Sequence, residues 1–553
     1  MDRPRSEVAP NRVPAWLVAA LLAIPIVFLV VFYAWPFITL LARGLTPATI
    51  EATFSRPSTW HVVWFTLWQA VASTVLTVIF GLLPAYVLSR YRFRGRRLLA
   101  GMLTAAFVLP TVVMGAAVLA LLPPGWERGT PAILVAHVMF NLAVVVRTVG
   151  AVWQHLSPDL EAAAATLGAS PWQAFREITL PLLWPAILAS AAVVFVFTFT
   201  SFGVIRVLGD AGTSTIEVEI WRRATQLGDI GAAATLAVLQ LVLIGAVVAW
   251  SLWQQRRHSR ALALRPLAVR VRPRSRRQRW LVAATATGTA IVAGAPLVAL
   301  VVRSLRGSTG WSLTAWRTLG DPELRPGINL GVDPLGAIAT SLRTAALATV
   351  LAVVIGALAA LGIATSARLG RLLDAGLMLP IATSAVTIGF GILITFDQPP
   401  VDWRASPLLV PIGQALVAVP FVVRIVLPVA RGIDPHLHEA AATLGASPVA
   451  AWREVTVPYI RRPIVLAAGL AAAISLGEFG ATSFLSRRGN ETMPIVIERL
   501  LGRTGAVLQA QAYALATILA VATVLIVVVL DLAGDRPRSA DLPMMMEASA
   551  RRP

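Results

Sequence analysis

The residues best placed to contact another protein lie in two copies of one short sequence. Residues 163–171 read AAATLGASP, and the same nine residues recur at 440–448. In both copies an aromatic residue and the pattern Arg-Glu-x-Thr-x-Pro follow, ending at positions 181 and 458. A run of small residues lets a partner surface approach closely. The pattern therefore favours a docking element that is present twice, with its copies 277 residues apart.

The flanking residues predict how each copy begins. Ser157 and Asp434 each precede a proline, which is the arrangement of an N-capping side chain followed by proline in the first helical turn. The alanine run favours helix strongly, and Gly168 and Gly445 stand where a left-handed residue ends a helix. Each copy should therefore start with a short helix that turns sharply at its glycine.

A second helix should follow each turn. Ser170 and Ser447 each precede a proline and predict a new N-cap, and in the first copy Gln173 completes a capping box. We expect this second helix to be closed at Pro181 or Pro458, where the next apolar stretch begins.

No residue pattern in the sequence predicts catalysis. Cysteine and lysine are both absent, which excludes cysteine-based zinc or redox sites and the lysine of a nucleotide-binding P-loop. The sequence has no nucleophile elbow, no paired carboxylates and no cluster of His, Asp and Glu with metal-ligand spacing. We therefore expect no catalytic residues, no bound metal and no cofactor. His137 should be satisfied by a neighbouring helix.

Composition places these elements in a membrane. Of the 553 residues, 57% are hydrophobic and 13% are charged, far from the balance of a soluble chain. A helix crosses a bilayer with roughly 20 mostly apolar residues. We count twelve such stretches and predict an all-α polytopic membrane protein. The stretches lie near residues 15–37, 60–88, 98–122, 131–153, 182–205, 229–253, 280–303, 336–364, 372–396, 406–430, 461–485 and 507–533.

Arginine clusters predict the orientation. They follow the second, sixth, eighth and twelfth stretches, which share one side of the membrane if the N-terminus is cytoplasmic. This distribution explains the net charge of +20 without a nucleic-acid partner. The arginine-rich linker at 256–279 should then be a solvated segment near anionic lipid. Both repeated segments and both chain termini are expected in the cytoplasm.

The duplication extends over the whole chain. Residues 137–147 align at the same offset with 414–424, and Phe202 aligns with Phe479. Six stretches in each half predict a parallel repeat with a pathway between the halves. The expected organisation is a first half at 1–255 with its loop at 157–181, the linker at 256–279, a second half at 280–535 with its loop at 434–458, and a C-terminal tail at 536–553.

The repeated segments resemble the EAA loop of permease subunits in binding-protein-dependent ABC importers. The second copy matches through Glu439-Ala440-Ala441 and Gly445, whereas the first has Ala162 at the glutamate position and Glu161 one residue earlier. In that family the loop forms a coupling helix that docks on a cytoplasmic ATPase subunit. The resemblance implies ATPase-coupling roles for Glu161, Ala163, Gly168, Ser170, Pro171, Glu439, Ala440, Gly445, Ser447 and Pro448.

Over the whole chain, the resemblance implies two fused six-helix halves of the type I importer permease fold. The implied partners are two separate ABC ATPase subunits, an extracytoplasmic solute-binding protein and the lipid of a bacterial inner membrane, and the chain itself would be no enzyme. The stretches 134–142, 200–203 and 215–220 are most similar to thiamine and ferric-iron permeases, whereas 475–480 also resembles molybdate and sulfate permeases. An oxyanion importer, an ion-driven carrier with internal repeats and a membrane scaffold stay open as alternatives.

Ser201, Phe202, Glu478 and Phe479 are candidates for the pathway or its gate. Glu478 should lie within the eleventh apolar stretch, with Ser201 at the matching position of the fifth. An ionised acid at bilayer depth costs on the order of 3 kcal/mol or more, so its carboxylate should face a cavity or hydrogen-bond to neighbouring helices. The two phenylalanines could close a dry constriction between the halves or simply contribute to packing.

Overall fold

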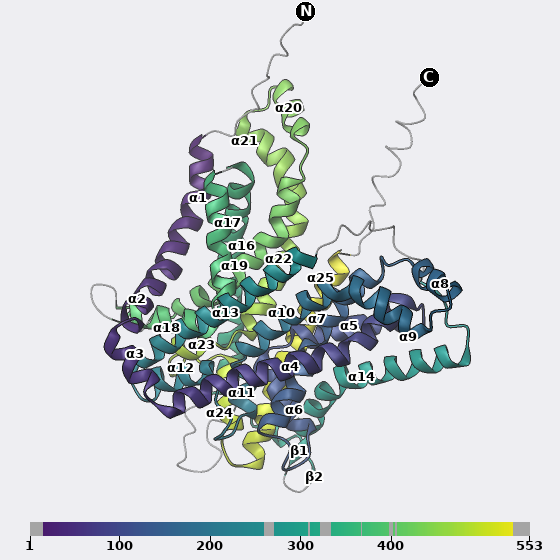
Figure 1. Cartoon of the computed structure of the whole chain (residues 1–553). Helices are drawn as coiled ribbons and strands as arrows, with labels where there is room; N and C mark the ends of the chain where they lie inside the picture. Colours follow the sequence, from purple (N-terminus) through teal and green to yellow (C-terminus); the bar gives the residue numbers. More distant parts are fainter. Residues whose placement is uncertain are drawn as a thin grey trace, which may run out of the picture.

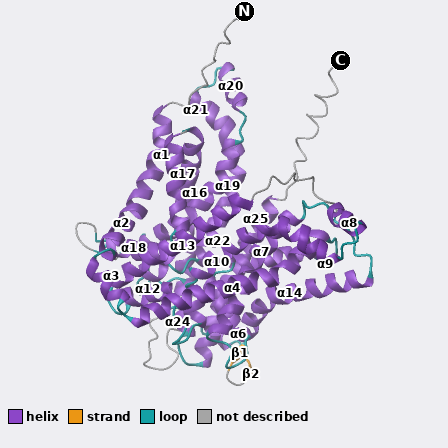
Figure 2. Cartoon of the chain, in the orientation of Figure 1, coloured by secondary structure: helices purple, strands orange, loops and turns teal. Residues whose placement is uncertain are grey.

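The secondary structure is almost entirely helical, which confirms the all-α class (Figure 1, Figure 2). The computed structural model describes residues 15–258, 270–307, 310–320, 333–366, 368–397, 402–403 and 406–534. Within that part of the chain the strands are one short antiparallel pair, β1 (Arg306–Gly307) and β2 (Gly310–Trp311). Helix packing alone therefore builds the core.

The helices follow the predicted order, with short helices between the long ones. The first half contains α1 (Ala15–Leu29), the π-helical turn η1 (Val30–Ala34), α2 (Trp35–Gly44), α3 (Pro47–Phe54), α4 (Pro57–Arg90), α5 (Arg96–Val108), α6 (Thr111–Leu121), α7 (Thr130–Trp153), α8 (Pro158–Thr166), α9 (Pro171–Ala174), η2 (Phe175–Thr179), α10 (Leu180–Phe199), α11 (Gly203–Leu208), α12 (Ile216–Thr225) and α13 (Ile230–His258). The second half contains α14 (Arg276–Ser304), α15 (Thr314–Arg317), α16 (Pro334–Thr365), α17 (Arg368–Ala382), α18 (Ala385–Thr395), α19 (Leu409–Arg431), α20 (Pro435–Thr443), α21 (Pro448–Ala451), η3 (Trp452–Thr456), α22 (Val457–Gly477), α23 (Thr482–Leu485), α24 (Met493–Leu501) and α25 (Ala506–Gly534).

Ten helical segments in the described residues are long and apolar enough to cross a membrane. Two further pairs pass that test only together, α5 with α6 and α17 with α18, and they bend by 109° and 99°. In the described residues the twelve predicted spans thus correspond to ten helical segments and these two bent pairs, with the helix broken inside the stretches at 98–122 and 372–396. Leu109 is extended because the following Pro110 disfavours helical backbone in the residue before it. In the second half Ser384 caps α18 and starts a new helix.

The first helix of each half packs on the other half (Figure 1). α1 runs along α16 and α17, and α14 lies against α5 and α6. These contacts are close, because a Cβ atom at Gly362 would lie 2.6 Å from the Leu22 side chain and one at Gly294 would lie 3.1 Å from Met102. The two halves are therefore interlocked.

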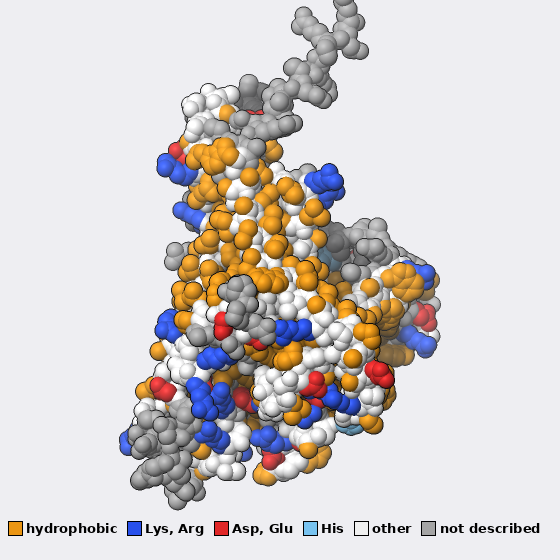
Figure 3. Space-filling view, turned by 90° about the vertical axis from the view of Figure 1, so that its left-hand side faces the viewer, with side chains coloured by type: hydrophobic (Ala, Val, Ile, Leu, Met, Phe, Trp, Pro, Cys, Tyr) orange, Lys and Arg blue, Asp and Glu red, His pale blue; other side chains and the backbone are white. Residues whose placement is uncertain are grey.

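The two helix bundles diverge from a shared region (Figure 1). α20 and α21 form the end of one bundle, and α8 and α9 form the end of the other. In the shared region α12 contacts α18 and α24 contacts α6, so each contact joins one half to the other. On the face seen in Figure 3, hydrophobic side chains cover the upper part and charged side chains gather toward the lower part. A broad apolar surface of this kind suits a lipid environment.

The described end of the linker is ordered against the first half. Val271 forms a parallel bridge with Tyr91, in which the Val271 amide donates to the Arg90 carbonyl at 3.1 Å. Residues 271–272 and 274–277 are nonetheless exposed, as the expectation of a solvated linker requires for this end. Residues 259–269 of the linker, the first 14 residues of the chain and the predicted tail at 536–553 lie outside the described residues.

Candidate functional site: two repeated loops and the contact between the halves

The first helix of each repeated loop is capped as predicted. The Ser157 hydroxyl accepts a hydrogen bond from the Asp159 amide at 3.3 Å, and Asp434 Oδ1 accepts one from the His436 amide at 3.0 Å. The chain then turns at glycines with φ of 86° at Gly168 and 84° at Gly445. Residues with side chains rarely adopt this left-handed backbone, so the glycines are required at these positions.

The second helix of each loop begins as predicted but does not end where expected. Ser170 and Gln173 form the reciprocal capping box, with hydrogen bonds of 2.8 and 3.3 Å. The helix then continues through the π-helical turn η2 into α10, and its counterpart continues through η3 into α22. The prediction of closure at Pro181 and Pro458 is therefore wrong. Each proline is the second residue after a widened turn, where its missing amide and bulky ring are tolerated.

Glu161 and His438 occupy the same position in the two loops and make equivalent contacts. Glu161 Oε1 accepts a hydrogen bond from the Thr179 hydroxyl at 2.7 Å, and His438 Nε2 lies 3.0 Å from the Thr456 hydroxyl. Arg90 also contacts the Glu161 carboxylate at 3.4 Å. This position therefore fastens the first helix of each loop to the start of the following span.

Glu161 is consequently not a displaced copy of Glu439. Glu439 lies one position further along α20, and its Oε2 atom is 2.9 Å from His436 Nδ1. The side chain of Glu439 is about half exposed, whereas Ala162 occupies the equivalent position on α8. The two loops therefore have similar backbone conformations but different charged side chains on their exposed surfaces.

Each loop presents a leucine that sequence analysis did not single out. Leu167 and Leu444 are equivalent residues directly before the turn glycines, and they are 89% and 88% exposed. Ala163, Gly168, Ser170 and Pro171 are also exposed. In the second loop Glu439, Ala440, Gly445 and Ser447 are exposed too, and Pro448 is the first residue of α21. Two equivalent exposed leucines therefore lie directly after α8 and α20. Their presence in both copies was the signal available in the sequence.

The four pathway candidates lie in breaks between helices. α10 ends at Phe199 and α22 ends at Gly477, so Ser201 and Glu478 follow these helices directly. The expectation that Glu478 lies inside a continuous span is therefore wrong. The apolar sequence continues through each break, but a new short helix, α11 or α23, starts beyond it.

The breaks bring Phe202 and Phe479 together across the contact between the halves. Their ring centroids are 5.0 Å apart with the planes 27° from parallel, and both side chains are buried. The following glycines allow the approach of neighbouring helices. A Cβ atom at Gly203 would lie 2.3 Å from the Thr111 hydroxyl, and one at Gly480 would lie 3.0 Å from Ala385. Phe202 and Phe479, which the sequence places at equivalent positions of the two halves, are therefore in direct contact.

The carboxylate of Glu478 accepts hydrogen bonds from residues that follow it directly in the chain. Its Oε1 atom accepts from the Ala481 amide at 2.7 Å, and Oε2 accepts from the Thr482 amide and hydroxyl at 2.9 and 2.5 Å. This geometry stabilises the first turn of α23, as an N-terminal carboxylate does. It matches the hydrogen-bonded alternative for Glu478, and contact with solute stays a prediction.

Ser201, at the position equivalent to Glu478, belongs to a buried polar chain. His137 Nε2 lies 2.9 Å from the Ser201 hydroxyl, and His137 Nδ1 lies 2.9 Å from the Ser73 hydroxyl. The histidine thus joins α4, α7 and the break, as the prediction of a satisfied histidine requires. Among the described residues no group of three or more His, Asp or Glu side chains is arranged to hold a metal ion.

Arg206, Trp221 and Glu498 form a further contact between the halves that sequence analysis missed. The Arg206 guanidinium carbon lies 4.0 Å above the Trp221 ring, and the same group pairs with Glu498 on α24. Among ion pairs in which both residues are described, this one joins the two halves. Trp221 and Glu498 are equivalent positions 277 residues apart, so one arginine bridges two equivalent sites. Arg206 lies one helical turn after Phe202, beside the phenylalanine stack.

The fold and the two loops together define a polytopic permease made of two related halves. The family described as "Binding-protein-dependent transport system inner membrane component" matches residues 77–257 and 352–536, and the chain belongs to this family. One match falls in each half, which is the duplication that the repeated loops predict. The chain is therefore a membrane-spanning component of a binding-protein-dependent importer.

Individual relatives resemble the chain to different extents. The thiamine transport system permease protein ThiP of Salmonella typhimurium is 27% identical over 521 residues, covering 89% of this chain and 92% of that protein. ThiP of Brucella abortus is 28% identical over 508 residues, covering 87% of this chain and 89% of that protein. The sulfate transport system permease protein CysT of Escherichia coli is 34% identical over 197 residues, covering 33% of this chain and 71% of that protein.

Proposed function

We propose that this chain forms the translocation pathway of an ATP-driven importer, with its two loops docked on two separate ATPase subunits. The single observation that carries the proposal is the pair of exposed leucines, Leu167 and Leu444, at equivalent positions at the ends of the two diverging bundles. Both loops and both chain termini face the cytoplasm in this proposal, since the arginine clusters favour that side. A solute-binding protein delivers the cargo to the opposite face.

A continuous helix connects each loop to the contact between the halves. The segment from Pro171 to Phe199 is helical throughout, and Phe202 follows it. The hydrogen bond between Glu161 and Thr179 fixes the first loop helix to this segment. Movement of a docked ATPase therefore displaces Phe202 relative to Phe479. Nucleotide binding by the partners can shift the balance between two arrangements of the halves only through such a differential contact.

The proposed cargo is thiamine or a closely similar cation. The thiamine permeases match nearly the whole chain, whereas the sulfate permease matches about a third of it. Ferric iron and oxyanions are the alternative cargoes, and they are outcomes of the uptake assay below.

The chain itself is proposed to perform no chemistry. Its sequence has no lysine for a P-loop, so ATP hydrolysis belongs to the partner subunits. The pathway subunit contributes binding surfaces and helix movement. An ion-driven carrier is the alternative mechanism, and it would transport solute without an ATPase.

Transport by the reconstituted complex tests the proposal. Proteoliposomes containing the chain, its ATPase and its binding protein should accumulate radiolabelled thiamine only with ATP inside the compartment that holds the ATPase. Uptake without ATP or ATPase would favour the ion-driven carrier. Uptake of ferric iron, molybdate or sulfate in place of thiamine would overturn the cargo and leave the importer mechanism intact.

A further inference from the structure

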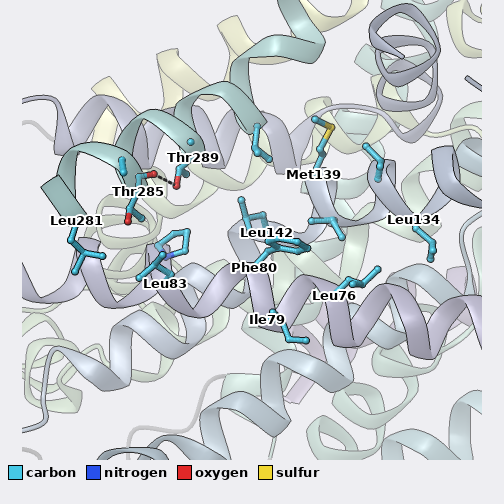
Figure 4. Close-up of a pocket in the computed structure, with 16 residues that line it drawn as sticks. Leu76, Ile79, Phe80, Leu83, Leu134, Met139, Leu142, Leu281, Thr285 and Thr289 are labelled. Atoms are coloured by element: carbon cyan, nitrogen blue, oxygen red, sulfur yellow. Dashed lines mark hydrogen bonds between the residues drawn. The ribbon is translucent and has the colours of Figure 1, made fainter. Parts of the chain in front are cut away.

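An apolar crevice separates α14 from α4 and α7 (Figure 4). It has a volume of about 610 Å³ and is lined almost wholly by hydrophobic side chains. Leu76, Phe80 and Leu83 come from α4, Met139 and Leu142 come from α7, and Thr285 lies on the α14 side. All three helices meet the criteria for a membrane span, so the crevice lies within the apolar part of the protein.

In the second half the corresponding helices α1 and α16 are in close contact. There α1 lies directly on α16, and a Cβ atom at Gly362 would be 2.6 Å from the Leu22 side chain. The positions equivalent to Phe80 and Leu83 are alanines 357 and 360, so smaller side chains allow the closer approach. On α14, by contrast, a Cβ atom at Gly288 would have no neighbour within 4 Å. The side chains at these positions therefore differ between the two halves.

Positive charge gathers at one end of the crevice. Its lining residue Leu281 packs with Val87 and Tyr91, and Tyr91 pairs with Val271, the neighbour of Arg270. Arg96 donates to the Leu88 carbonyl at 2.9 Å, just beyond the crevice-lining turn of α4. The arginines at this end thus lie about one or two helical turns from the apolar lining.

These arginines lack an anionic partner within the described part of the chain. Arg97 and Arg270 are the charged groups that act on Arg96, and both have the same sign of charge. Arg270 donates from one terminal nitrogen to Gln154 at 2.6 Å, but its buried Nε atom has no hydrogen-bond partner there. These neighbouring positive charges, together with the buried Arg270 Nε donor that has no partner, indicate that an anion binds at this place.

We propose that an anionic phospholipid binds here, with one acyl chain in the crevice and its phosphate on Arg96, Arg97 and Arg270. The crevice excludes a polar occupant, and guanidinium groups bind phosphate through charge-assisted hydrogen bonds. The lipid contacts α4 and α7 of the first half and α14 of the second half. It therefore stabilises the interlocked arrangement, at one site per chain.

Native mass spectrometry of the full chain, released from mixed phosphatidylglycerol and phosphatidylcholine nanodiscs, tests the proposal. Wild-type protein should retain one phosphatidylglycerol. Gly288→Trp fills the crevice and should reduce the retained lipid by about tenfold, the change expected for loss of one good contact. The matched control is Gly245→Trp on α13, because that glycine is also exposed with nothing within 4 Å. Equal retention by wild type and Gly288→Trp would overturn the site.

Substitutions of the three arginines test the headgroup contact separately. They keep the proposal testable if Gly288→Trp does not fold. Replacing Arg96, Arg97 and Arg270 with glutamine should abolish the preference for phosphatidylglycerol over phosphatidylcholine. Replacing Arg461 and Arg462, which are exposed on α22, should leave the preference unchanged. Glycerol phosphate without acyl chains should not raise the melting temperature of the wild type. A rise equal to that given by the lipid would indicate a simple anion site and contradict the proposal.

Discussion

Phe202 and Phe479, which occupy the same position in the two halves, stack on each other with ring centroids 5.0 Å apart. The halves therefore meet through equivalent residues beside α11 and α23, while the two repeated loops lie at the ends of diverging bundles (Figure 1). A closed contact on one side and separated loops on the other describe one of the two arrangements that alternating access needs. The proposed gate lies at this stack.

Removing the stack should open a leak. The double substitution Phe202→Ala and Phe479→Ala removes two buried rings, and each loss costs about 3–5 kcal/mol in a packed core. We expect downhill flux of radiolabelled thiamine through proteoliposomes without ATP, with each single variant giving an intermediate flux. Phe390→Ala is the control, since Phe390 is buried against Phe484 within one half. A leak of the same size in the control would assign the effect to general destabilisation.

The exposed leucines should matter for ATPase binding and little for folding. Leu167→Asp and Leu444→Asp place a charge on an apolar docking contact, where one residue can contribute about 2 kcal/mol or more, about 30-fold in affinity. Exposed positions change the free energy of unfolding by only about 0.5 kcal/mol. Co-purification and melting temperature measure the two effects. Leu227→Asp, an exposed leucine between α12 and α13, should retain the ATPase. Loss of binding in that control would contradict a local contact.

The Arg206 contact should stabilise the arrangement in which the halves meet. Arg206→Gln leaves the carboxylate of Glu498, which is mostly buried, without its partner and should cost about 1.5–3 kcal/mol. Glu498→Gln in the same chain should recover part of that loss, because it removes the unpaired charge. A double-mutant cycle on thermal unfolding measures the coupling. Strictly additive effects of the two substitutions would show that the pair contributes nothing.

The second loop should respond to pH and the first should not. The hydrogen bond to Glu439 and the charge of Asp434 raise the pKa of His436 above its ordinary value of 6.5. A raised histidine pKa means that the pair is fully formed below pH 6.5 and is lost as the pH rises through the raised value. Asp159 occupies the equivalent position in the first loop, which therefore lacks this switch. Histidine NMR should show the His436 pKa falling in Glu439→Gln, and an unchanged value would rule out the pair.

Local signals predicted the loops, whereas contacts distant in sequence escaped prediction. Ser157, Gly168 and Ser170 act on residues within one turn, so their types and spacing were sufficient to predict the caps. The bend at Pro110 carried a local signal too, but the apolar stretch around it concealed the break. Arg206 and Glu498 are 292 residues apart, and only the folded chain brings them together.

The role of Glu161 follows from the likeness of the two halves. The first loop has Ala162 at the position of Glu439, and Glu161 corresponds to His438. The structure agrees, because Glu161 and His438 both contact the threonine that ends the following π-helical turn. The likeness of the two halves was therefore the better guide to side-chain roles than the motif.

Labelling of introduced cysteines tests the central claim most directly, since the natural chain has none that would react. Leu167→Cys and Leu444→Cys should each react with a membrane-impermeant maleimide in inverted membrane vesicles, and added ATPase subunits should block both reactions. Intact cells should show no labelling. Reaction of either cysteine from outside intact cells, or reaction in vesicles that the ATPase leaves unchanged, would contradict the account of two cytoplasmic docking loops.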